Sequence, residues 1–389
     1  MIAYNNEWLN NLLVQDQADK VINTNCISKE EKEIIAANYR VGFYSPNFFV
    51  RIGLFILTWV ILIFGMGLIS LIVFSSLSND KAAGGIFIFF GVVIYGGLEL
   101  MVNNKHYKSG VDDALMWMSA GCVIGGLNTL TNISSEANAI LIFMIALFLF
   151  LRFTNMLMAG IASLALLAII FFSVIKFGAV AKAITPFVIM IASAFIYFFT
   201  KQFLKDQKWK HYFNGLLMIS ITALVCFYVA GNYFVVREAS IAMFNLDLKP
   251  GETIAFGWLF WLFTICIPVL YIIGGIQSKD AILLRVGLLL LTAVVFTVRY
   301  YYHILPAEAA MVIGGIIFIV IAYALIKYLH EPKYGFTDKQ QDEPFFMDKL
   351  NVESLVIAQS FSGSALPATD TGTQFGGGSG GGGGAGGTF

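Results

Sequence analysis

The sequence predicts an all-α membrane protein, a polytopic bundle of about ten transmembrane helices followed by a disordered, glycine-rich tail. Hydrophobic residues make up 58% of the chain and charged residues only 12%, and the mean hydropathy is +0.78. A soluble domain usually carries about 25% charged residues. The apolar residues also fall into runs close to the roughly 20 helical residues that cross a hydrocarbon core of about 30 Å.

The balance of charge and the missing motifs exclude several classes of function. The chain has 24 basic and 24 acidic residues, so it has no basic excess with which to bind nucleic acid. The four cysteines have no paired spacing and the four histidines are scattered, so we expect no metal and no cofactor. Neither a His-Glu-x-x-His motif nor a P-loop is present, and we therefore expect a protein that is not an enzyme.

Residues 1–48 are predicted to form a cytoplasmic helical hairpin. Apolar residues recur there at helical spacing, for example Trp8, Leu9 and Leu12. Ser28 and Glu31 have the spacing of a capping box, which predicts that a second helix begins at this point. We expect this hairpin to be a loosely packed cap on the first membrane span.

Residues 49–329 are predicted to form the transmembrane bundle. Its ten expected spans are 52–77, 82–102, 114–130, 137–151, 156–175, 183–200, 212–236, 254–276, 281–298 and 309–326. The third, which contains Asn128, and the fourth, which is only fifteen residues long, are the least apolar and the shortest. An even number of spans places both termini on one side of the membrane.

The basic residues of the short loops indicate which side that is. Eight lie in loops on the side of the N-terminus and six on the opposite side. The eight are Lys105, Lys108, Arg152, Lys201, Lys205, Lys208, Lys210 and Lys279, and the six are Lys81, Lys176, Lys182, Arg237, Lys249 and Arg299. This bias predicts a multi-pass protein of the inner (plasma) membrane with both termini in the cytoplasm.

Four ionisable residues near the cytoplasmic ends of spans are candidates for an ion or transport site: Glu99, Asp112, Asp113 and Arg285. A charge in hydrocarbon is costly and persists where it has a partner or a function. One hypothesis is a cytoplasm-facing polar cavity in which Arg285 holds Glu99 or the aspartate pair. The favoured alternative is a set of helix-end charges that reach the interface.

Residues on the opposite face and in the span interiors give weaker signals. Arg299, Tyr301, His303 and Glu308 precede the last span, where an interfacial aromatic belt is favoured over an external mouth. Gly121 and Gly125 form a G-x-x-x-G pair typical of close helix packing. Pro268 is expected to interrupt the middle of the eighth span.

Two stretches resemble an uncharacterised bacterial family of polytopic inner-membrane proteins that has a short helical hairpin before many spans. They are residues 25–35, with Ile-Ser followed by acidic residues and an Ile-Ile pair, and the aromatic run 299–303. Pro306, Ala307 and Glu308 depart from the basic residue expected after the tyrosines. The resemblance implies a membrane protein of about ten spans without an established activity.

The remaining residues divide into a polar cytoplasmic segment, 330–361, and a flexible tail, 362–389, that is rich in glycine. The tail is similar to Gly-rich endings of other bacterial membrane-associated proteins. Phe375 and Phe389 bracket the glycines and would anchor an extended segment on a protein partner, whereas the alternative is a disordered leash. We therefore favour a non-enzymatic accessory or scaffold protein that recruits a partner through this tail, with a secondary transporter or channel as the alternative.

Overall fold

The computed structural model describes residues 2–23, 26–74, 80–244 and 254–301, and seven residues between 312 and 327. These residues are almost entirely helical, and among them the single β contact is an isolated bridge between Tyr44 and His106. The helices are α1 (Asn6–Asn23), α2 (Lys29–Asn38), α3 (Phe48–Phe74), α4 (Asp80–Asn103), α5 (Val111–Thr131), α6 (Ser135–Phe153), α7 (Met156–Ile175), α8 (Ala179–Lys205), η1 (Gln207–Tyr212), α9 (Phe213–Gly231), α10 (Tyr233–Phe244), α11 (Gly257–Ser278) and α12 (Ala281–Tyr301). The predicted all-α class is confirmed.

Nine helices of the described part are long and apolar enough to cross a membrane. They are α3 to α9, α11 and α12, and each coincides with one of the first nine predicted spans. The short fourth span is real, because α6 extends to 19 residues once its polar ends are included. The tenth predicted span, 309–326, lies largely outside the described residues, and so do 330–361 and the tail with Phe375 and Phe389.

The boundary of the seventh span differs from the prediction. One span was expected over 212–236, but α9 ends at Gly231 and α10 begins at Tyr233. Asn232 separates the two helices, and its side-chain oxygen accepts a hydrogen bond from the Val235 backbone N–H at 3.2 Å. An asparagine that caps a new helix in this way ends the previous one.

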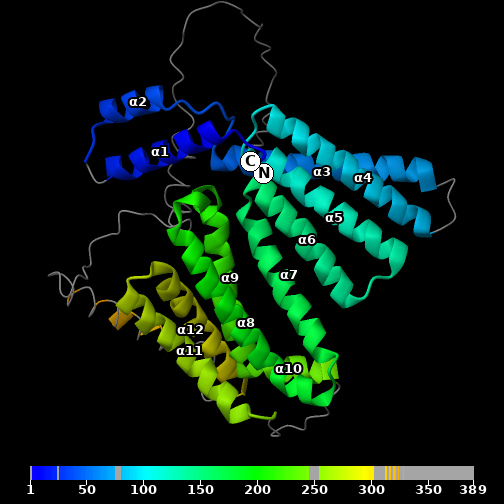
Figure 1. The fold of residues 1–389 in the computed structure, drawn as a ribbon, viewed down its shortest axis with the longest axis vertical. Helices are drawn as coiled ribbons and strands as arrows, with labels where there is room; N and C mark the ends of the chain where they lie inside the picture. Colours follow the sequence, from blue (N-terminus) through cyan, green and yellow to red (C-terminus); the bar gives the residue numbers. More distant parts are fainter. Residues whose placement is uncertain are drawn as a thin grey trace, which may run out of the picture.

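The spans fall into two halves, as Figure 1 shows. Helices α3 to α7 form one half, while α8, α9, α11 and α12 form the other, and α7 packs against both α8 and α9. Successive spans run antiparallel, so one end of the bundle collects the first residues of some helices and the last residues of others. The helices that begin there are α3, α5, α7, η1 and α12, and those that end there are α4, α6, α8 and α11. We call this end of the bundle the N-terminal face, since α1 and α2 adjoin it.

The N-terminal hairpin has the predicted capping box. The Glu31 carboxylate accepts from the Ser28 backbone N–H at 2.8 Å, and the Ser28 hydroxyl accepts from the Glu31 N–H at 3.2 Å. The expectation of loose packing does not describe α1 and the residues before it. Tyr4 and Leu9 are buried and belong to the same apolar core as Tyr107 and Phe153.

Helices α4 and α5 pack closely against each other, with Gly84 and Gly126 facing across the contact. A Cβ at Gly126 would lie 2.7 Å from the Gly84 carbonyl oxygen and 2.9 Å from the Ile88 nitrogen, whereas one at Gly121 or Gly125 would meet nothing within 4 Å. The predicted G-x-x-x-G face is therefore shifted by one residue, because Gly126 rather than Gly125 points at α4.

Replacing Gly126 by alanine should destabilise the bundle, because the added methyl group meets backbone atoms that cannot move aside. Overpacking of this kind costs about 1–3 kcal/mol. The Gly125→Ala variant is the matched control, since alanine fits the open space there and favours a helix. We expect thermal unfolding in detergent to show a lower midpoint for Gly126→Ala only, and equal midpoints for the two variants would contradict this packing.

Candidate functional site at the N-terminal face

Asp113 joins three helices at the N-terminal face. The Arg51 guanidinium on α3 donates to its Oδ2 at 2.5 Å from Nη2 and 3.2 Å from Nε. The Asn155 amide donates to Oδ1 at 3.0 Å, while the Asn155 oxygen accepts from the first N–H groups of α7. The Asp113 side chain is only 12% exposed, so the ion pair compensates a desolvated carboxylate.

Asp112 has a different function from its neighbour. Its Oδ1 accepts hydrogen bonds from the Ser109 N–H at 2.9 Å, the Gly110 N–H at 3.1 Å and the Ser109 hydroxyl at 3.1 Å. Gly110 has φ of +93°, and a Cβ there would lie 2.1 Å from the Arg51 carbonyl oxygen, so only glycine fits. Asp112 thus holds the loop before α5 in the shape that brings Arg51 to Asp113.

Glu99 pairs with Arg152 and joins α4 to α6. The two form a bidentate pair, with Nε to Oε1 at 2.6 Å and Nη2 to Oε2 at 2.8 Å, and the Tyr95 hydroxyl donates to Oε1 at 2.5 Å. The Glu99 and Arg152 side chains are 24% and 33% exposed. This geometry satisfies both carboxylate oxygens close to the hydrocarbon boundary.

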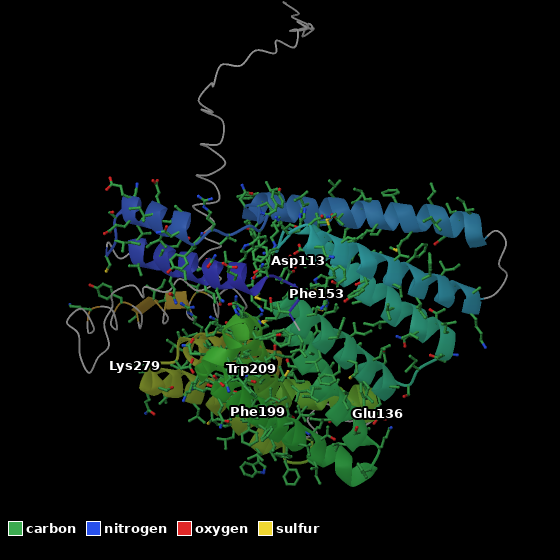
Figure 2. All side chains as sticks on the ribbon, turned by 45° about the horizontal axis from the view of Figure 1, so that its top comes forward. Asp113, Glu136, Phe153, Phe199, Trp209 and Lys279 are labelled. Atoms are coloured by element: carbon green, nitrogen blue, oxygen red, sulfur yellow. The ribbon has the colours of Figure 1, made fainter. Side chains whose placement is uncertain are left out.

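The start of the chain is bound to the same helix ends. The Ala3 N–H donates to the Arg152 carbonyl oxygen at 2.9 Å, and the Tyr4 ring packs edge-on against Tyr107 and Phe153. Burial, together with the nearby Asp112 charge, raises the pKa of Tyr4 well above its ordinary value, so its hydroxyl is neutral. Figure 2 shows Asp113 and Phe153 close together where the helices of the first half converge.

The structure does not pair Arg285 with the predicted acidic residues. Arg285 lies on α12, which packs against α11 and α9 in the other half of the bundle. The ion-pair partners are instead Arg152 for Glu99 and Arg51 for Asp113. The hypothesis that Arg285 holds Glu99 or the aspartate pair in one cavity is therefore corrected. Two separate ion pairs, Glu99–Arg152 and Arg51–Asp113, lie within the first half.

A third pair at this face was not predicted. The Lys201 ammonium on α8 donates to Asp280 Oδ2 at 3.0 Å, and Asp280 Oδ1 accepts from the N–H groups of Ile282 and Leu283 at the start of α12. Burial opposes ionisation of Asp280, but these hydrogen bonds outweigh it and hold the pKa below its ordinary value. The sequence signal was an aspartate in N-cap position directly before an apolar run.

The opposite ends of the spans carry the predicted aromatic residues. Tyr301 ends α12 and packs against Tyr233 and Trp261, with the Arg237 guanidinium 5.6 Å from its ring centre. Arg299 lies in the last turn of α12, while His303 and Glu308 lie outside the described residues. Tyr233 is buried in this cluster, and the choice between an interfacial belt and an external mouth stays a prediction, because His303 and Glu308 are not described.

A buried polar cluster surrounds the break between α9 and α10. The Asn232 amide donates to the Tyr228 hydroxyl at 2.9 Å and to the Thr297 hydroxyl at 3.1 Å, and the Thr264 hydroxyl accepts from the Tyr233 N–H at 2.9 Å. Pro268 lies one turn beyond Thr264, yet α11 continues through it. The expected interruption of the eighth span at Pro268 is therefore wrong, and the break at Asn232 belongs to a different span.

The arrangement of the described helices and ion pairs defines a multi-pass membrane protein, but it does not indicate a reaction or a ligand. Among the described residues, no group of three or more His, Cys, Asp or Glu side chains is placed to hold a metal ion. No protein-family model, curated protein or solved structure matches the chain. The protein is a multi-pass membrane protein in which three ion pairs at the N-terminal face, Arg51–Asp113, Glu99–Arg152 and Lys201–Asp280, link segments of different spans.

Removing the Glu99–Arg152 pair should destabilise the first half. Glu99→Gln or Arg152→Gln leaves the other group without its partner. The free energy of unfolding should fall by on the order of 1–3 kcal/mol, a value between the costs of breaking an exposed pair and a fully buried pair. Lys32→Gln is the control, because its pair with Asp19 is exposed and contributes less than about 1 kcal/mol. Chemical unfolding of the purified variants measures both effects, and a cost no larger than that of Lys32→Gln would contradict the assigned fastening.

Proposed function

We propose that this protein is a non-enzymatic membrane scaffold that recruits a partner protein through its C-terminal tail, residues 362–389. The observation that carries the proposal is the engagement of the candidate carboxylates. Glu99, Asp113 and Asp280 each bind a cation on another helix, and Asp112 holds a loop. Because breaking a largely buried ion pair is destabilising, groups paired in this way support a structural function for the N-terminal face.

The tail supplies the second part of the proposal. Glycine makes up most of residues 376–388, and a segment of this composition loses much backbone entropy when it becomes ordered. An extended segment with an aromatic residue at each end suits strand addition, in which backbone hydrogen bonds give affinity and side-chain pockets give specificity. Phe375 and Phe389 are the proposed anchors.

Affinity purification from detergent tests recruitment. The full chain should retain a partner in stoichiometric amount, and removal of residues 362–389 should release it. A variant with Phe375→Ala and Phe389→Ala keeps the length and flexibility of the tail and should weaken retention by about tenfold or more, the cost of losing buried aromatic anchors. An identical set of retained proteins for all three chains would contradict recruitment through the tail.

We further propose that the protein lies in the inner membrane of a bacterial cell with both termini in the cytoplasm, as the basic loop residues indicate. Cys26 provides a natural probe, because it is exposed in the hairpin whereas Cys122, Cys226 and Cys266 lie in spans. A membrane-impermeant maleimide should label the chain only after the cells are permeabilised, and Cys26→Ser should abolish that label. Labelling of intact cells at Cys26 would reverse the orientation.

The polar break at Asn232 favours a second candidate, a secondary transporter or channel. Transporter sites often lie at helices that are broken near the bilayer midplane. Since Asn232 follows a complete span, Gln207–Gly231, the buried polar cluster around Asn232 is the observation behind this candidate. A transporter should dissipate a proton or sodium gradient across liposomes faster than empty liposomes do, and Asn232→Ala should slow this flux. Flux equal to that of empty liposomes for both ions would contradict transport of either one.

A further inference from the structure

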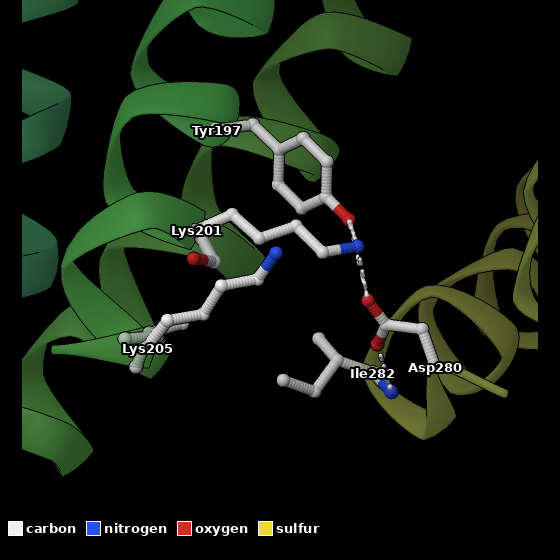
Figure 3. Close-up of a pocket in the computed structure, with 7 residues that line it drawn as sticks. Tyr197, Lys201, Lys205, Asp280 and Ile282 are labelled. Carbon is white, nitrogen blue, oxygen red and sulfur yellow. Dashed lines mark hydrogen bonds and ion pairs between the residues drawn. The ribbon is translucent and has the colours of Figure 1, made fainter. Parts of the chain in front are cut away.

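A cavity of about 180 Å³ lies at the N-terminal face between the end of α8, α9 and the start of α12. Figure 3 shows Lys205 extending from its backbone toward the space beside Lys201, Tyr197 and Asp280. Leucine and isoleucine side chains complete the lining. The cavity therefore has a charged rim and partly apolar walls.

The two lysines at the rim differ in their bonding. The Lys201 ammonium is held by Asp280 at 3.0 Å and approaches the Tyr197 hydroxyl at 3.4 Å. Lys205 is exposed, and within the described part of the chain no acidic side chain pairs with it. Lys201, Lys205 and Asp280 together give the cavity one net positive charge.

Ser220 also lines this cavity. The residue is 2% exposed, its hydroxyl oxygen is covered, and among the described residues this hydroxyl has no hydrogen-bond partner. A buried hydroxyl without a partner costs about 1–3 kcal/mol. A ligand with an acceptor oxygen at this position would remove that cost.

The polar groups around the cavity lie at two depths along the helices. Lys205 is the last residue of α8, while Tyr197 lies eight residues before it, about 12 Å deeper along the helix axis. Ser220 follows the first residue of α9 by seven positions, which is a comparable depth of roughly 10 Å. Lys208 and Lys210 follow in η1, which contacts both α8 and α9.

We propose that this cavity binds the headgroup of an anionic phospholipid. The phosphate lies at Lys205, with Lys201 nearby, and the Ser220 hydroxyl donates to an ester carbonyl oxygen of the glycerol backbone. Asp280 is a carboxylate near the anion, but Lys201 neutralises it. The net positive charge discriminates against a choline headgroup, and basic pockets between spans favour anionic lipids.

Thermal unfolding of the full chain in detergent tests this proposal with three probes: short-chain phosphatidylglycerol, short-chain phosphatidylcholine of equal chain length, and inorganic phosphate. Phosphatidylglycerol should raise the midpoint saturably, at concentrations at least about tenfold lower than phosphatidylcholine requires. Inorganic phosphate shares the anionic group but lacks the ester, so it should produce the weakest effect. A midpoint shift from phosphate equal to that from phosphatidylglycerol would identify a soluble-anion site and overturn the lipid proposal.

Three variants locate the effect. Lys205→Gln should weaken the response to phosphatidylglycerol about tenfold, the usual effect of a lost charged hydrogen bond. Ser220→Ala should weaken it several-fold without lowering the midpoint of the unliganded protein, because its hydroxyl has no partner to lose. Lys29→Gln, which removes an exposed charge on α2, should leave the response unchanged.

The proposal fails if phosphatidylglycerol and phosphatidylcholine act at equal concentrations, or if Lys205→Gln responds as the unchanged chain does. A lower unliganded midpoint for Ser220→Ala would show that the hydroxyl already has a structural partner, and would also count against it. None of these results depends on the C-terminal tail. Lipid binding and the recruitment of a partner through the tail are therefore tested independently.

Discussion

The pairing of charges at the boundary of the hydrocarbon is the constraint on which the first half of the bundle depends. Glu99 lies within an otherwise apolar span, and Arg152 meets both of its oxygens at 2.6 and 2.8 Å. The largely buried Asp113 carboxylate likewise needs hydrogen-bond donors, which Arg51 and Asn155 supply. Because an unpaired charge there is costly, the pairing favours arrangements that bring α3 beside α5 and α4 beside α6 at this face.

The N-terminal segment and the loop before α5 depend on these fastenings. Arg152 accepts the Ala3 N–H through its carbonyl while its guanidinium binds Glu99, so one residue links the start of the chain to α4. Tyr44 exchanges hydrogen bonds with Lys105 and Tyr107, which joins the segment before α3 to the loop after α4. The N-terminal segment and the loops around α4 and α5 are consequently one continuous structure rather than a set of separate loops.

The spans were predictable from sequence because hydrophobic length is a local signal, and nine of the ten expected spans coincide with described helices. The capping box of Ser28 and Glu31 was predictable for the same reason. The partners of Glu99 and Asp113 were not, since they lie 53 and 62 residues away and depend on helix order. The contact at Gly126 was not predicted because the neighbouring helix decides which side of α5 is packed. The helix break at Asn232 was not predicted because its polar partners, such as Thr297, lie on other helices.

Hydrogen exchange at the N-terminal face tests most directly whether its polar groups fasten the structure together. The amides of Ala3, Tyr44 and Tyr107 all donate to backbone carbonyls of other segments. In the intact protein in a bilayer nanodisc, we expect them to exchange about a hundredfold or more slowly than in an unfolded peptide, equivalent to an opening cost near 3 kcal/mol. Exchange at the unfolded rate would show that the hairpin and loop are not held, and would contradict the account of this face as a fastened platform.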